Sequence, residues 1–388
     1  MLTPGSPLSY IAFCKRPTAL SNFTRGLYRF YRKGVLAMSI PHLQGKVQTV
    51  LGVIDPADLG ITLPHEHIVS DGAAWFVEPE EATDRAMARA KLSLETLSWV
   101  RYHWFQNLDD MLMLDEEEAV AEVLHFKWAG GKTIVEMSNH GLGRDPQALA
   151  RISRRTGLHI LMGCGYYFAA SLPKGFEAKS EEEITEEIVR DITTGVGNTN
   201  LKAGYIGEIG TSWPIDSREV KSLRAAVKAQ KITGANLNVH PGQAEEAAFR
   251  CLDILQEAGA DLSRTTMDHI DRAVRLPENR FKLLEKGLIL EYDLFGREGY
   301  YPLKQRHIDL PTDHQRLNEI IEIIKAGYIK QVLISQDIWN KHQRKKYGGW
   351  GYDHILRNTL PVMRAKGMSE EQIRTLLVDN PRRVYTFA

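Results

Sequence analysis

The sequence has few cysteines, no net charge and no long apolar run. Its 388 residues include only Cys14, Cys164 and Cys251, which provide neither a disulfide framework nor the Cys-x-x-Cys spacing of a structural zinc site. Lys and Arg together number 49, as do Asp and Glu, so no overall field would attract nucleic acid or an anionic membrane. No apolar run is long enough to cross a bilayer. We therefore expect neither nucleic acid nor a membrane as a partner. The predicted partner is a small-molecule substrate, and a homodimer is left open.

Acidic residues are absent from the first 54 positions, which carry seven Lys or Arg. An acidic-poor, basic segment of this kind is typical of an organelle transit peptide, and a disordered leader ahead of a chain that starts near Met38 is the alternative. We therefore predict an N-terminal leader over residues 1–40 and a functional domain over residues 41–388. The scattered cysteines favour a reducing compartment. The predicted location is the cytoplasm, or the mitochondrion if the leader is an address.

After this segment, short apolar runs alternate with amphipathic stretches. The eight candidate strands are 61–67, 133–139, 159–167, 203–210, 235–242, 264–271, 288–296 and 331–338. Strands that alternate with helical patterns favour a parallel sheet with crossover helices. Eight such repeats predict an α/β fold of the (β/α)8 TIM-barrel type, and an open doubly wound sheet is the alternative.

Two additions to the barrel are expected. The run Val50–Ile54 predicts a small N-terminal β-hairpin ahead of strand one. The long stretch 72–125 predicts a helical insertion after strand one, because helical patterns occur at 83–98 and 115–128.

The first predicted strand ends in the sequence His65-Glu66-His67. Side chains alternate along a strand, so His65 and His67 point to the same side and Glu66 points away. Two imidazoles from one strand end form half of a transition-metal site. Glu66 is predicted to be structural.

Four more metal-compatible residues lie at the ends of later strands. They are Glu208 on strand four, His240 on strand five, His269 on strand six and Asp337 on strand eight. Each one alone has an ordinary explanation, such as a hydrogen-bonded core histidine or a helix cap. In a barrel, however, these strand ends converge on one face. Four imidazoles and two carboxylates there predict a site for two divalent metal ions that share a carboxylate. Zinc is the first choice, with manganese, cobalt and iron as alternatives.

Several segments also resemble the phosphotriesterase family of the amidohydrolase superfamily, in particular its phosphotriesterase-related branch. The segments are 45–52 (GKVQTVLG), 64–67 (PHEH), 207–210 (GEIG), 240–242 (HPG), 291–296 (EYDLFG) and 345–355 (KKYGGWGYDHI). The resemblance implies that His65, His67 and Asp337 hold a buried metal ion. It further implies that His240 and His269 hold an exposed ion and that the strand-four residue bridges the two.

Two departures from the family pattern accompany the resemblance. Organophosphate hydrolases use a carboxylated lysine as the bridge, whereas this chain has Glu208, which argues against efficient phosphotriester hydrolysis. Gln336 stands where some relatives carry histidine.

The reaction implied is hydrolysis, in which a metal-bound hydroxide attacks a carbonyl and Asp337 accepts the proton. By resemblance, the substrate is an N-acyl amide such as N-acetyltaurine or an N-acetyl amino acid, with lactonase or phosphotriesterase activity as the alternative. A metal-binding barrel without useful turnover is the alternative outside the enzymes. An anionic substrate tail needs a cation. The candidates for the substrate site are Arg272 first, then Lys341 and Arg297, with Tyr167 and Trp339 as pocket walls.

Overall fold

Eight buried strands form the centre of the structure, a computed structural model that describes residues 42–303 and 307–388. They are β3 (Thr62–Glu66), β6 (Thr133–Glu136), β7 (His159–Met162), β8 (Ile206–Gly210), β9 (Leu237–His240), β10 (Thr265–Met267), β11 (Ile289–Tyr292) and β14 (Val332–Ile334). The strands pair in parallel within two sheets, of order β3-β6-β7 and β8-β9-β10-β11-β14. Residues 1–40, where a leader is predicted, lie outside the described residues.

Backbone hydrogen bonds join the two sheets at both edges. Gly204 N–H donates to Met162 O between β7 and β8, over 2.8 Å. On the other side, Asp337 N–H donates to His65 O over 3.2 Å, which connects the end of β14 to β3. The fold is therefore the predicted (β/α)8 barrel, and the open doubly wound alternative is wrong.

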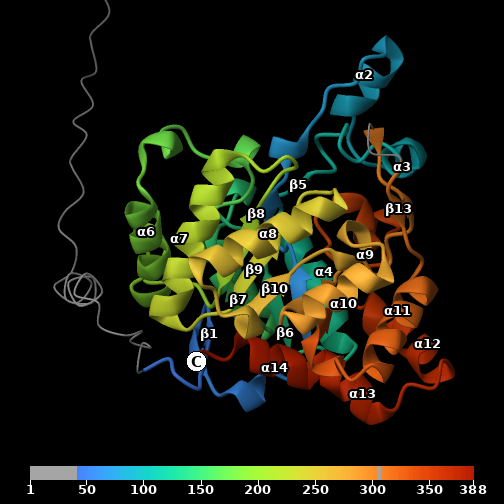
Figure 1. The fold of residues 1–388 in the computed structure, drawn as a ribbon. Helices are drawn as coiled ribbons and strands as arrows, with labels where there is room; N and C mark the ends of the chain where they lie inside the picture. Colours follow the sequence, from blue (N-terminus) through green and yellow to red (C-terminus); the bar gives the residue numbers. More distant parts are fainter. Residues whose placement is uncertain (1–41, 304–306) are drawn as a thin grey trace, which may run out of the picture. The chain divides into compact units, whose positions relative to one another are not determined.

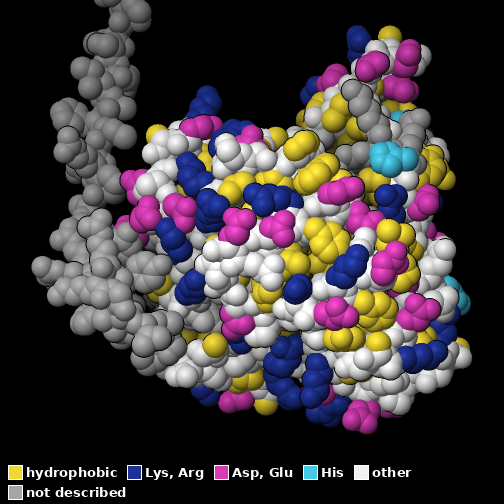
Figure 2. Space-filling view, in the orientation of Figure 1, with side chains coloured by type: hydrophobic (Ala, Val, Ile, Leu, Met, Phe, Trp, Pro, Cys, Tyr) yellow, Lys and Arg dark blue, Asp and Glu magenta, His cyan; other side chains and the backbone are white. Residues whose placement is uncertain are grey.

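Helices follow the strands and cover the barrel from outside (Figure 1). They are α4 (Glu116–Trp128), α5 (Pro146–Thr156), α6 (Glu181–Thr193), α7 (Ser217–Thr233), α8 (Glu245–Ala258), α9 (Ile270–Ala273), α10 (Pro277–Glu285), α11 (Asp313–Lys325), α12 (Leu360–Ala365), α13 (Glu370–Arg374) and α14 (Asn380–Tyr385). Basic and acidic side chains are interspersed over the face in view (Figure 2). Within the described residues, no helix combines the length and apolar character that crossing a membrane requires.

The inside of the barrel changes in character from one end to the other. Alternate strand residues pack together with side chains from β1 and α14 in one apolar cluster: Val47, Leu59, Val135, Met137, Leu161, Tyr205, Ile289, Leu333, Val384 and Tyr385. Because the side-chain period of a strand is two, the same inward series continues along the strands to polar residues. Along β11, for example, Ile289 is followed by Glu291 and then Asp293. The apolar cluster thus forms the floor of the barrel, and the polar site lies above it, toward the carboxyl ends of the strands.

The N-terminal hairpin is present. β1 (Val47–Thr49) pairs antiparallel with β2 (Gly52–Ile54). The end of the chain joins it, because Gly45 N–H donates to Phe387 O and Phe387 N–H donates to Lys46 O, both over 2.9 Å.

The insertion after strand one is shorter than predicted. β4 (Ser70–Asp71) and β5 (Leu112–Met113) pair antiparallel at its base, and it carries α2 (Ala82–Arg89) and α3 (Leu94–Val100). α2 projects away from the barrel (Figure 1). The prediction assigned most of α4 to the insertion, but α4 follows β5 and packs on α5, so it is a barrel helix. The Asp115 side chain accepts from Glu118 N–H and caps its start.

Two further short strands, β12 (Gly299–Tyr300) and β13 (Asp309–Leu310), pair antiparallel after β11.

Within the insertion, the single helix predicted over residues 83–98 is instead two helices, α2 and α3, because Ser93 and Thr96 form a capping box that starts α3.

One buried ion pair fixes α11 against the barrel. Arg316 is fully buried, and its Nε lies 2.6 Å from Asp271 Oδ2. We expect Arg316→Met to lower the free energy of unfolding by about 3–5 kcal/mol, because it leaves a buried carboxylate without its partner. Arg364→Met, which breaks an exposed pair with Glu370, should leave stability unchanged. Urea unfolding of both variants measures the difference, and equal stability losses would contradict the assignment.

Candidate metal centre

The six predicted metal ligands come together at the carboxyl ends of their strands. His65, His67 and Glu208 form one group whose potential ligand atoms all lie within 4.8 Å of one another, and Glu208, His240 and His269 form a second. Glu208 belongs to both groups. Asp337 lies against the first group, because its Oδ1 is 3.4 Å from His67 Nε2 and 3.8 Å from His65 Nε2. The arrangement is the one that a shared carboxylate between two metal positions requires.

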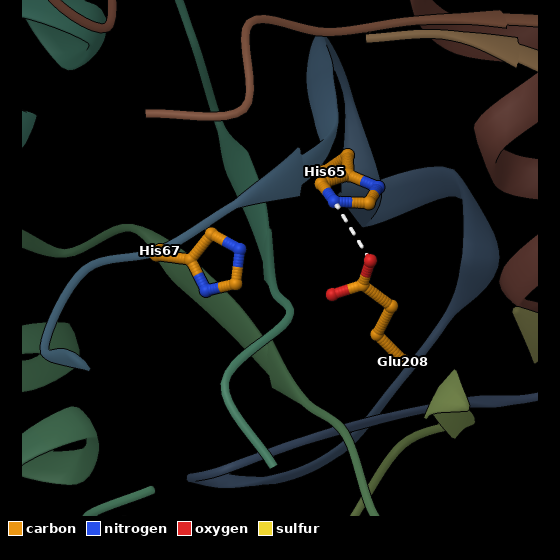
Figure 3. Close-up of side chains that lie close together, drawn as sticks. All are labelled: His65, His67 and Glu208. Carbon is orange, nitrogen blue, oxygen red and sulfur yellow. Dashed lines mark ion pairs between the residues drawn. The ribbon is translucent and has the colours of Figure 1, made fainter. Parts of the chain in front are cut away.

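The first group is assembled from β3 and β8. His65, His67 and Glu208 point toward one common space (Figure 3), and His65 Nε2 lies 3.9 Å from Glu208 Oε1. The remaining nitrogen of each imidazole is held from behind. His65 Nδ1 is 3.0 Å from Glu291 Oε2, and His67 Nδ1 is 3.0 Å from Ser138 Oγ. These contacts leave both Nε2 atoms directed into the site.

The second group is tighter. Glu208 Oε1 contacts His240 Nδ1 and lies 3.0 Å from His269 Nε2, and those two nitrogens are 2.8 Å apart. Asp293 fixes His269 from behind, because its Oδ1 is 2.7 Å from His269 Nδ1 and its Oδ2 accepts from His269 N–H over 2.8 Å. The Nδ1 atom of His269 is therefore held by Asp293, and its Nε2 atom faces Glu208 in the site.

The backbone at two of these residues is unusual. His269 has φ of 54° and Asp337 has φ of 47°, and Leu303 is the only other described non-glycine residue with positive φ. Residues with a Cβ rarely adopt this conformation, and it persists where surrounding contacts enforce it. At His269 the two hydrogen bonds to Asp293 are such contacts. The conformation turns both side chains inward just after their strands end.

Buried carboxylates surround the imidazoles and were missed in the sequence. Asp268, Glu291 and Asp293 are fully buried, and all three lie within 4.0 Å of His65 Nδ1. The spacing of Glu291 and Asp293 on strand seven could have revealed them. Residues two positions apart on a strand point to the same side, so both side chains point into the barrel with Ile289. Ser138 was missed as well, because a serine after a strand carries no distinctive pattern.

These carboxylates give the site an affinity for positive charge. Burial would lower the pKa of His65 and His269, but the neighbouring carboxylates, with Asp293 foremost, raise it in both. For His240, burial prevails and lowers the pKa to about 3. Burial would raise the pKa of Glu208, yet His240 and His269 hold it well below its ordinary value. The site thus combines the ionised carboxylate of Glu208 with the neutral imidazole of His240, whereas His65 and His269, whose pKa values are raised, would give up a proton on binding a metal ion.

The donor set fits divalent cations. His65 Nε2 and Glu208 Oε2 are buried and have no hydrogen-bond partner within the described part of the chain. Buried polar atoms without a partner are costly, and both residues belong to the first ligand group. Imidazole nitrogen combined with carboxylate oxygen suits zinc and its neighbours in the transition series.

Glu66 is structural, as predicted. Its carboxylate accepts from Gln336 N–H over 3.0 Å and from Ile338 N–H over 2.9 Å, so it fastens the end of β14 to β3. Gln336, where some family members carry histidine, donates to Tyr352 O over 3.1 Å and accepts from Ile355 N–H over 2.9 Å. It therefore holds the segment after β14 and does not face the site.

A pocket of about 460 Å³, its open mouth included, leads to this site. Its lining includes Arg272, Tyr167 and Trp339, as predicted for the substrate site, together with Trp75, Phe105 and Tyr301. A volume of this order suits a small molecule. The insertion residues Trp75 and Phe105 were missed, because no strand pattern places them near the barrel mouth.

Two predicted substrate residues are placed elsewhere. Lys341 does not line the pocket, because its Nζ is 2.9 Å from Asp109 Oδ1 and this ion pair holds it on the insertion. Arg297 also lies outside the lining and binds Asp337 from behind. Its Nη2 donates to Asp337 O over 3.0 Å, and its Nη1 is 3.6 Å from Asp337 Oδ2. Both assignments to the substrate pocket are corrected.

Residues 45–385 match the model of the phosphotriesterase family. The chain belongs to the phosphotriesterase family. An N-acetyltaurine hydrolase from Dictyostelium discoideum is 38% identical over 363 residues, covering 88% of this chain and 98% of the relative. A phosphotriesterase-related protein from Nematostella vectensis is 41% identical and covers 88% and 99%.

Solved structures of the phosphotriesterase family share the fold. A resiniferatoxin-binding protein from Rhodobacter sphaeroides has a TM-score of 0.87 at 36% identity, covering 90% of this chain and 98% of that one. A lactonase from Listeria monocytogenes has a TM-score of 0.72 at 26% identity, covering 88% and 99%. The phosphotriesterase family consists of metal-dependent hydrolases, and this chain is a hydrolase of that family.

Proposed function

We propose that this protein hydrolyses an N-acyl amide that carries an anionic tail, such as N-acetyltaurine or an N-acetyl amino acid, and that it uses two divalent metal ions. The observation that carries the proposal is the guanidinium of Arg272, which lines the pocket next to the second ligand group. Relatives named N-acetyltaurine hydrolase support the same class of substrate.

Arg272 is 1% exposed, and no carboxylate lies within ion-pair distance of it in the described part of the chain. Its Nη2 contacts His240 Nε2 over 3.1 Å and Pro241 O over 3.3 Å, while its Nη1 has no partner among the described residues. A buried guanidinium without a counter-ion is expensive, and a sulfonate or carboxylate of the substrate would satisfy it through paired hydrogen bonds. We therefore propose that the anionic tail binds beside His240.

The six convergent residues would hold the metal ions. His65, His67 and Asp337 would bind one, His240 and His269 the other, and Glu208 both. When bound, the ions supply an ionised water at neutral pH and polarise the substrate carbonyl. The chain itself orients the ligands, through Glu291 on His65 and Asp293 on His269.

Asp337 is the proposed proton acceptor. Burial would raise its pKa, but the hydrogen bond from His67 and the charge of Arg297 lower it to about 2. The carboxylate is therefore ionised at neutral pH and able to take a proton from water and pass it to the leaving nitrogen. Tyr167 also lines the pocket, with its hydroxyl 3.3 Å from His240 Nδ1.

Arg272→Ala tests the anion site. We expect kcat/KM for N-acetyltaurine to fall by about 100-fold, because a charged hydrogen-bonded contact contributes about 2–3 kcal/mol. N-acetylethanolamine, which has a neutral tail, should lose less than about fivefold. Arg272→Lys should recover part of the activity, and Lys341→Ala should leave it within about twofold. An equal loss with both substrates would show that Arg272 only supports His240, and full activity in the variant would remove Arg272 from the site.

A substrate panel tests the reaction itself. The metal-loaded protein is assayed with N-acyl amino acids, lactones and phosphotriesters. Preferred turnover of the anionic amides supports the proposal, while a preference for lactones or phosphotriesters would replace it. Bound metal without turnover of any class would favour a binding protein.

A further inference from the structure

Two cavities share one aromatic wall at the barrel mouth. The pocket over the metal centre and a larger outer groove of about 1510 Å³, open solvent included, are both lined by Trp75 and Phe105. The groove is otherwise formed by the start of the insertion, by His103 and Gln106, and by Pro302 and Leu303. The two side chains therefore stand between the inner pocket and a space that could extend it.

Ring stacking and a backbone hydrogen bond hold Trp75 and Phe105 in this wall. The Trp75 ring stacks on Phe168 at 4.1 Å and on Phe105 at 5.6 Å between ring centroids. A backbone hydrogen bond from Val77 N–H to Phe105 O, over 2.8 Å, ties the two segments of the insertion together. Stacked aromatic rings on paired segments form a rigid boundary and not an adaptable one.

The composition of the groove indicates what it would accept. Its apolar lining comprises Val77, Pro79, Pro302 and Leu303, and its acidic residues are Glu78, Glu80, Glu81 and Asp84. Carboxylates repel an anionic tail, whereas apolar side chains favour a neutral chain. Trp75 also lies near His240, with 6.4 Å between the ring centroids. With the anionic end of the substrate bound by Arg272, the acyl group is the part that we assign to the side of the wall that faces the groove.

We propose that Trp75 and Phe105 set the upper length of the acyl chain, and that the outer groove receives the distal methylenes of a longer chain once the wall is removed. This inference rests on the proposed amide hydrolysis. The wall makes the protein selective for short acyl groups, since the additional methylenes of a longer chain would overlap with the Trp75 and Phe105 side chains.

The test compares acetyl, butanoyl, hexanoyl and octanoyl taurine. For the unmodified chain, kcat/KM should fall by about tenfold or more from acetyl to hexanoyl. Trp75→Ala and Phe105→Leu should each raise the hexanoyl-to-acetyl ratio of kcat/KM by about tenfold or more, while Trp75→Phe should keep the original ratio. Trp128→Ala removes an exposed tryptophan that lines neither cavity and is the matched control.

Affinities measured by titration calorimetry with the same four compounds give a readout that needs no turnover. If no acyl taurine is hydrolysed by the unmodified protein, the proposed function fails, while a gain in hexanoyl affinity in Trp75→Ala still supports the wall. If both wall variants fold and keep the original chain-length profile in rates and affinities, the inference is overturned. It is also overturned if the unmodified protein prefers hexanoyl to acetyl. Phe105→Leu carries the test if Trp75→Ala does not fold.

Discussion

Glu208→Gln is expected to abolish hydrolysis and to reduce the bound metal from the proposed two ions per chain to one or none. Glu208 belongs to both ligand groups, and its Oε1 contacts His240 and His269. The amide is neutral and offers one ligand oxygen in place of two. We expect kcat/KM to fall by about 10³-fold, which corresponds to the several kcal/mol that metal ions contribute to the transition state. Elemental analysis of the purified protein, combined with kinetics, measures both effects.

Glu122→Gln is a matched control for this variant. Glu122 is also buried, but its carboxylate accepts from Lys345 N–H and Lys346 N–H, away from the pocket lining. Its metal content should be unchanged. Two ions in Glu208→Gln at full occupancy would show that another residue bridges the centre.

Asp337→Asn is expected to separate metal binding from turnover. The amide has the shape of the carboxylate and keeps an oxygen toward His67, so the fold and most of the bound metal should remain. It cannot accept a proton, and general-base catalysis of this kind contributes about 10²–10⁴-fold to rate. We therefore expect kcat to fall by that factor, while the midpoint temperature of thermal unfolding stays within a few degrees of that of the unmodified protein. Stopped assays over hours, with metal content determined on the same sample, give the comparison.

Retained turnover in Asp337→Asn would remove the proton-acceptor role. Loss of metal in parallel with loss of rate would instead make Asp337 a ligand whose charge is needed for binding. The contrast with Glu208→Gln is informative, since that variant is expected to lose metal and rate together.

Much of the site could be predicted from strand ends alone. His65, Glu208, His240, His269 and Asp337 each close a short apolar run, and the eight runs alternate with helices. Because parallel strands in a barrel present their carboxyl ends to one face, the topology brings together residues that are far apart in the chain. The resemblance to a known family added the expected role of each residue.

The remainder depended on contacts that a sequence does not display. Lys341 and Arg297 have the charge that a substrate anion needs, but Asp109 and Asp337 bind them. Arg272, on α9, has the same charge and forms no ion pair with a carboxylate among residues 42–303 and 307–388. Which of the three cations remains available to a substrate depends on its neighbours in space. The sequence ranked Arg272 first but could not show that carboxylates bind the other two.

The walls of the pocket were missed for a related reason. Trp75 and Phe105 lie in an insertion whose path over the barrel is set by the β4–β5 pairing and by packing with Trp339 and Tyr301. Insertions have no fixed geometry relative to a barrel, so periodicity locates their helices but not the cavity that they cover.

The closure of the barrel floor by the end of the chain has a consequence for biosynthesis. The Tyr385 hydroxyl donates to Pro64 O over 3.0 Å inside the barrel, and Phe387 pairs with the residues ahead of β1. Translation proceeds from the amino end, so β3 leaves the ribosome well before the residues of α14 that pack beneath it. The barrel floor can therefore form only after residues 384–387 have been synthesised, and removal of these residues would expose the apolar cluster around Tyr385 to water.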